Sequence, residues 1–78
     1  MMNRTQVNKM IRKFTASGAE FTNWSKDGSG DSYKVEFKLN GKEFLVAMEK
    51  PTQLSVCSKK DYAWKETGSF DATLAAMQ

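Results

Sequence analysis

The sequence predicts an α+β domain with two layers: an antiparallel sheet of four or five strands, and an N-terminal and a C-terminal helix on one side of it. Three observations lead to this prediction. An Asn-Gly pair centres a run of alternating apolar residues, amphipathic stretches of helical period begin and end the chain, and short alternating segments lie between them. With 78 residues, 40% hydrophobic and 27% charged, residues 1–78 suit a single small domain.

The first helix is expected from about residue 5 to residue 16, with Asn3 or Thr5 as its cap. Ser17-Gly18 follows it, and a glycine at this place typically ends a helix. The residues that share the spacing i, i+3, i+4, i+7 and should face the core are Val7, Met10, Ile11 and Phe14.

Residues 19–25 read as a short strand that follows this helix. Phe21 should face the core, and Trp24, which has the opposite parity, should lie on the outer face of the sheet. A loop, KDGSGD, then leads from residue 26 to residue 31.

That loop spaces oxygen side chains as the first half of an EF-hand calcium loop does, at Asp27, Ser29 and Asp31. Ser32 stands where the turn glycine of an EF-hand belongs, and Lys38 stands where its bidentate glutamate belongs. We therefore expect an ordinary flexible connection and no metal site.

The stretch from Tyr33 to Met48, YKVEFKLNGKEFLVAM, predicts a β-hairpin that turns at Asn40-Gly41. Closing the turn there places Tyr33 opposite Met48, Val35 opposite Val46, and Phe37 opposite Phe44. A register slip by one residue would send Lys and Glu into the core, so the pairing is well specified.

Residues 49–52 contain Pro51 and should break the sheet ladder, after which 53–58 alternates with Leu54 and Val56 on one side. Residues 59–61 should form a polar turn.

The segment 62–66 is expected to form a fifth strand with Tyr62 and Trp64 on the same face. Ser69 should cap a terminal helix whose apolar stripe is Phe70, Leu74 and Met77. Asp71 would lie in the first turn of that helix, where the helix dipole favours a negative charge.

The residue types argue against an enzyme. Histidine is absent, which removes the commonest general base and metal ligand, and the lone Cys57 has no His to activate it. Cys57 is interpreted as a small packing residue. Glu36, Glu43 and Glu49 stand near lysines on strands and suit solvated ion pairs, and no glycine-rich phosphate loop is present. No cofactor is expected.

Positive charge is concentrated in the first third of the chain. Residues 1–26 hold five cations and one acid, a net charge of +4, whereas residues 27–78 hold seven cations and eight acids. At 100° per residue, Lys9, Arg12 and Lys13 cluster on the side of the first helix opposite its apolar stripe. This side is either a solvated face or a face that contacts phosphates.

The outer face of the sheet is the other candidate site, since the hairpin directs Leu45, Ala47 and several lysines to it. Such a face would suit docking of a protein if it is bare, or would be covered by a helix or loop; both remain open. The protein-binding candidates are Trp24, Lys34, Lys38, Leu45, Tyr62 and Trp64.

The segment KVEFKLNGKEF is similar to the central hairpin of double-stranded RNA-binding domains, which also run helix, three strands, helix. In that family a lysine cluster at the start of the last helix grips phosphates. Here that helix carries Asp71 and no Lys or Arg, and extra strands are expected between residues 53 and 66. Membership in the family is therefore not inferred.

We expect a small non-enzymatic protein-interaction module, a monomer or weak dimer, that binds another protein, with inhibition of that protein as one role. Its size and missing site chemistry resemble those of small accessory proteins of phages and mobile elements. The alternative is a nucleic-acid-binding domain that uses the basic helix face and exposed aromatics. No signal peptide or membrane span is apparent, so we expect a cytoplasmic protein without membrane partners.

Overall fold

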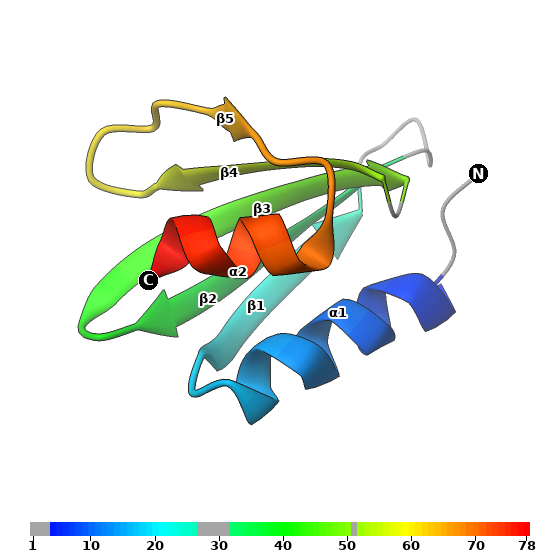
Figure 1. Ribbon diagram of the computed structural model, residues 1–78, viewed down its shortest axis with the longest axis horizontal. Coiled ribbons are helices and arrows are strands. Elements are labelled where there is room, and N and C mark those ends of the chain that lie inside the picture. The colour runs from blue at the N-terminus through cyan, green and yellow to red at the C-terminus, as the bar shows by residue number, and fades with distance from the viewer. Residues whose placement is uncertain (1–3, 27–31, 51) are drawn as a thin grey trace.

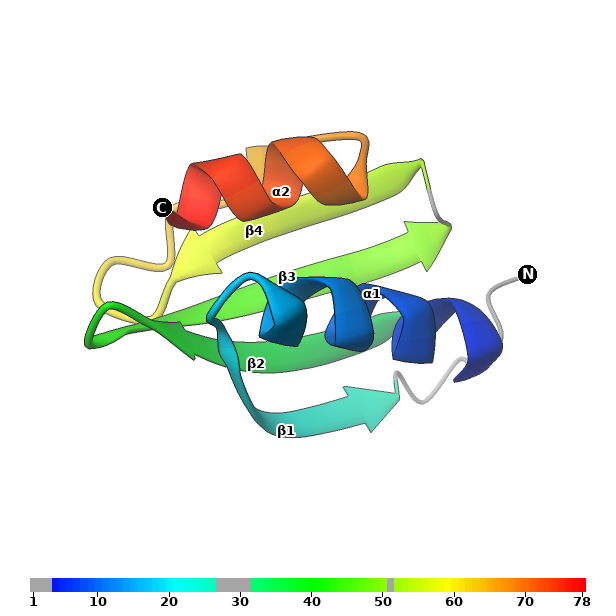
Figure 2. The ribbon, with the colours of Figure 1, turned by 60° about the horizontal axis from the view of Figure 1, so that its bottom comes forward.

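A computed structural model of the chain describes residues 4–26, 32–50 and 52–78. The elements are, in order, α1 (Arg4–Ala16), β1 (Glu20–Lys26), β2 (Tyr33–Leu39), β3 (Lys42–Lys50), β4 (Gln53–Ser58), β5 (Lys65–Glu66) and α2 (Phe70–Met77). The five strands form one antiparallel sheet in chain order, and both helices lie on the same face of it (Figures 1 and 2). The predicted two-layer α+β architecture is confirmed.

The β2–β3 hairpin has the predicted register throughout, with Tyr33 opposite Met48 and Phe37 opposite Phe44. Its turn residues Asn40 and Gly41 have φ angles of 54° and 79°, both positive as a type I′ turn requires. The turn chemistry and the alternation of apolar side chains thus specify the same pairing.

Phe14 of α1 links the three parts of the core. Its ring centroid lies 5.0 Å from that of Phe37 on β2 and 6.5 Å from that of Phe70 on α2. The predicted stripe of α1 points to the sheet, with Val7, Met10 and Phe14 fully buried and Ile11 partly buried against the core. The two helices therefore share one hydrophobic core with β2, β3 and β4.

A β-bulge in β1 changes the face on which Trp24 lies. Phe21 pairs with Phe37, but Trp24 pairs with Val35, because the register shifts between Phe21 and Asn23. Thr22 is the extra residue, so Phe21 and Trp24 both face the helices. The prediction that Trp24 lies on the outer face is wrong, because it assumed regular alternation of side chains along the strand and the bulge interrupts that alternation.

The segment after β4 is a hydrogen-bonded loop where a longer strand was predicted. β5 contains Lys65 and Glu66, while Tyr62 has a φ of 54°, which a strand residue does not adopt. The Tyr62 amide donates to the Ser58 carbonyl at 2.8 Å, and the Ala63 amide donates to Asp61 Oδ1 at 3.1 Å. The prediction that strand five begins at Tyr62 is therefore wrong.

A buried hydroxyl fixes α2 on the sheet. Ser69 caps the helix as predicted, accepting from the Ala72 amide at 3.1 Å. Thr73 is fully buried, and its hydroxyl donates to the Ser69 carbonyl at 2.7 Å and contacts the Thr67 hydroxyl. The Thr67 amide in turn donates to the Leu54 carbonyl at 2.9 Å. This network joins the start of α2 to β4.

Two features expected from the sequence lie outside the described residues. They are the connection at 27–31, where the calcium-loop likeness falls, and Pro51, the expected strand breaker.

Replacing Gly41 tests whether the turn conformation stabilises the hairpin. We expect Gly41→Ala to lower the free energy of unfolding by about 1 kcal/mol, because an L side chain is strained at positive φ. No atom lies within 4 Å of the added Cβ, so the cost is conformational. Urea denaturation measures it, with Lys42→Ala, beside the positive-φ pair, as the control. Equal effects of the two substitutions would contradict the prediction.

Candidate interaction surfaces

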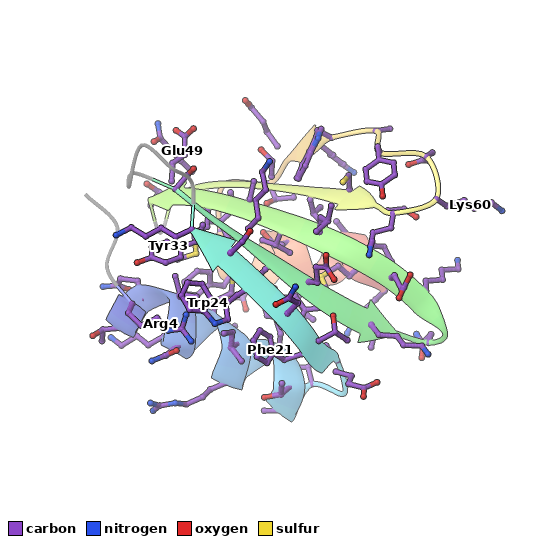
Figure 3. The ribbon with its side chains drawn as sticks, turned by 180° about the vertical axis from the view of Figure 1, so that it is seen from behind. Arg4, Phe21, Trp24, Tyr33, Glu49 and Lys60 are labelled. Carbon is purple, nitrogen blue, oxygen red and sulfur yellow. The ribbon has the colours of Figure 1, made fainter. Side chains whose placement is uncertain are left out.

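No helix among the described residues covers the outer face of the sheet, which is turned toward the viewer in Figure 3. Its side chains form rows that cross the strands. One row consists of Ser25, Lys34, Ala47 and Ser55, and the next of Asn23, Glu36, Leu45 and Cys57. Leu45 and Ala47 are half-buried among these polar neighbours. The face is thus bare of helices but only weakly apolar.

Charges of both signs occupy this outer face. Lys34 and Lys38 are exposed, and Lys59 Nζ lies 3.6 Å from Glu36 Oε2. A partly exposed ion pair of this kind contributes on the order of 0–1 kcal/mol. An alternation of cations and acids suits a protein partner better than the uniformly negative backbone of a nucleic acid.

Cys57 lies at the β4 end of the second row yet is only 3% exposed. Burial raises the pKa of its thiol, a hydrogen bond with the Leu45 backbone lowers that pKa, and the nearby Asp61 raises it further. A thiol held protonated is a poor nucleophile, which agrees with the interpretation of Cys57 as a packing residue.

Tyr62 and Trp64 are the most exposed large hydrophobic side chains among the described residues, at 54% and 46%. They lie on the loop between β4 and β5, at the same end of the sheet as the β2–β3 turn (Figure 1). A hollow between that turn and the loop is lined by several charged side chains, namely Lys38, Lys42, Glu43, Lys59, Lys60 and Asp61. The aromatics are therefore displayed beside a polar, mixed-charge rim.

Trp24 lies elsewhere, between α1 and the edge of the sheet. Its ring centroid is 5.8 Å from that of Tyr33, and the guanidinium carbon of Arg4 lies 3.7 Å from the Trp24 ring centroid. Figure 3 shows Arg4, Trp24 and Tyr33 side by side, with Lys60 at the far end of the molecule. The structure does not bring Trp24 together with the other protein-binding candidates.

The contact with Arg4 was missed by sequence reasoning. Arg4 precedes the apolar stripe of α1, and the only signal for its partner would have been the bulge that turns Trp24 toward the helices.

The basic side of α1 is solvent-exposed as predicted. Lys9, Arg12 and Lys13 are all exposed, but Lys13 Nζ lies 2.9 Å from Asp71 Oδ1 of α2. The acid that the dipole of α2 favours therefore also neutralises one of the three cations.

Two negative findings concern the described part of the chain. Within residues 4–26, 32–50 and 52–78, no three metal-ligating side chains gather in a group. Neither α1 nor α2 has the length and apolar character that crossing a membrane would require.

Comparisons of the chain with protein-family models, curated proteins and solved structures found no match.

The stacking of Arg4 on Trp24 should hold the start of α1 to β1. We expect Arg4→Ala to lower the free energy of unfolding by about 0.5–1 kcal/mol, the value of a partly exposed cation–π contact. A double-mutant cycle with Trp24→Leu, followed by urea denaturation, should give a coupling energy of the same size. Lys9→Ala, on the same helix but without a ring beneath it, is the control; zero coupling would refute the contact.

The raised pKa of Cys57 makes stability depend on pH in the alkaline range. In the unfolded chain the thiol loses its proton near its ordinary pKa of about 8.5, whereas in the folded chain it keeps the proton to higher pH. Above this pH the unfolded state binds fewer protons, so folded stability falls as pH rises.

We therefore expect the stability of the wild type to fall between pH 8 and pH 10 by more than that of Cys57→Ala. The free energy of unfolding of the wild type can fall faster than that of Cys57→Ala by up to about 1.4 kcal/mol per pH unit, the limit when unfolding releases one proton. Urea denaturation across this range measures it, and the Lys and Tyr groups common to both proteins cancel. A constant stability difference between the two proteins would contradict the prediction.

Proposed function

We propose that this protein is a non-enzymatic interaction module that binds another protein through the β4–β5 loop and the adjoining outer face of the sheet. The observation that carries the proposal is the exposure of Tyr62 and Trp64 on a loop fixed by hydrogen bonds. Tyr and Trp are the residue types most often found as energetic centres of protein interfaces.

The loop conformation favours binding because it is already ordered. Tyr62 has the left-handed backbone conformation, which costs a non-glycine residue free energy and persists only where neighbouring contacts hold it. Here the Tyr62 amide is bonded to Ser58 and the Asp61 side chain to the Ala63 amide. An aromatic displayed in this way loses little further conformational entropy on docking.

The surroundings of the loop resemble the rim of a protein interface. Lys34 and Lys38 on β2 are exposed, Leu45 on β3 is half-buried, and acids alternate with them. In the proposed complex, Tyr62 and Trp64 enter an apolar depression on the partner and the outer face provides polar contacts around them.

A chain of this size that blocks a surface of its partner acts as an inhibitor or accessory protein. We include in the proposal the role typical of small phage or mobile-element proteins, which act on a host protein by binding alone.

Capture experiments with aromatic variants test the proposal. Affinity-tagged wild type is incubated with nuclease-treated bacterial lysate, and captured proteins are identified and remeasured as purified partners. We expect Tyr62→Ala and Trp64→Ala each to weaken binding at least fivefold, equivalent to about 1 kcal/mol, because truncating a central aromatic removes its buried contact area.

The matched control is Lys9→Gln with Arg12→Gln, which alters the exposed side of α1 and leaves the loop intact. A partner whose binding is unaffected by both aromatic substitutions, or is lost equally in the control, would refute the assignment of this surface.

A further inference from the structure

The solvent-facing side of α1 carries basic side chains and no acidic ones. The helix has thirteen residues, of which four are basic and none is acidic. Because Val7, Met10 and Phe14 point into the core, the geometry of 100° per residue directs Lys9 and Arg12 away from it. The exposed side therefore carries cations without acids of its own helix to neutralise them.

Arg4 adds a cation at the start of α1, on the flank of the helix that meets β1. Its guanidinium lies over the face of the Trp24 ring, 3.7 Å from the ring centroid. Where a guanidinium stacks on an aromatic ring, the contact uses the face of the guanidinium, and its N–H groups lie in the plane. The contact with Trp24 thus holds Arg4 in position, and a stacked guanidinium can still donate hydrogen bonds to an anion.

The exposed residues of α1 itself include no large apolar side chain, and Arg4 covers one face of the neighbouring Trp24 ring, which narrows the class of partner. The residues of α1 that are exposed are Arg4, Thr5, Lys9, Arg12, Lys13, Thr15 and Ala16. A membrane-surface helix would need the apolar stripe that is already buried in the core, and a protein interface would need an aromatic or aliphatic anchor. Cations with hydroxyls beside them are the groups that contact nucleic-acid phosphates.

We propose that α1 binds the phosphate backbone of nucleic acid through Arg4, Lys9 and Arg12. Contacts of this kind are independent of base sequence, and three of them give only weak binding, with a dissociation constant of about 1–100 μM. Tyr62 and Trp64 of the β4–β5 loop take no part in this binding, and Trp24 serves to position Arg4.

The contact between Lys13 and Asp71 limits the number of phosphate contacts that α1 can make. Asp71 neutralises the fourth cation of α1 through an exposed ion pair of 2.9 Å. Replacing Asp71 with Asn frees Lys13 and should add one phosphate contact.

This binding surface and the proposed protein-docking loop lie at opposite edges of the sheet. α1 lies beside β1, and the loop with Tyr62 and Trp64 joins β4 to β5 (Figures 1 and 2). The two proposed sites share no residue, and either proposal can fail without the other.

Fluorescence anisotropy with a labelled 20-base-pair DNA duplex, titrated at 20 to 200 mM NaCl, tests the proposal. We expect the logarithm of the binding constant to fall with the logarithm of salt concentration with a slope of about −2.7, or −0.9 for each phosphate contact. Lys9→Gln with Arg12→Gln should bring the slope to about −0.9, and Asp71→Asn should steepen it to about −3.6.

Lys34→Gln with Lys38→Gln is the matched control, because it removes the same net charge from the outer face of the sheet. An unchanged slope in this control, with the shifts above, supports the proposal. Equal losses in both double variants, a salt-independent affinity, or no binding at 20 mM NaCl would each overturn it. Circular dichroism of every variant verifies that the fold is retained.

Discussion

The register of the β2–β3 hairpin is the constraint on which the rest of the structure depends. Two consecutive residues with positive φ, Asn40 and Gly41, fix which residues of the two strands face each other. Once Phe37 and Phe44 share a face, that face is the only one apolar enough to receive the helices. Phe14 then closes the core between α1, β2 and α2.

The parts of the fold that follow from short-range rules could be predicted from the sequence. Turn chemistry determined the hairpin, helical spacing determined α1, and the hydroxyl of Ser69 determined the start of α2. The bulge at Thr22 could not be predicted, because an inserted residue leaves no mark in a seven-residue strand that is mostly exposed. Thr73 was missed because apolar periodicity does not detect a polar residue buried by its hydrogen bonds.

The candidate surfaces, too, were predictable only in part. The exposure of Lys9, Arg12 and Lys13 follows directly from helix geometry. The outward direction of Lys34 and Lys38 follows from the alternation of side chains along a strand. The grouping of these residues depends on tertiary contacts that a single sequence does not reveal. One inserted residue separated Trp24 from the proposed docking surface and placed it under Arg4, next to the basic helix. Trp24 therefore lies beside the basic helix, apart from Tyr62 and Trp64, with which it was grouped as a protein-binding candidate.

The bulge in β1 also bears on how copies of this protein behave at high concentration. Among the described strands β1 is an edge strand that pairs with β2, and an open strand edge is a template for pairing with another chain. The extra residue Thr22 divides the strand into stretches of two and four residues whose outward amide and carbonyl groups are out of phase. Neither stretch is long enough to hold a second copy in a continuous ladder. The same insertion that places Trp24 therefore acts against the growth of intermolecular sheets.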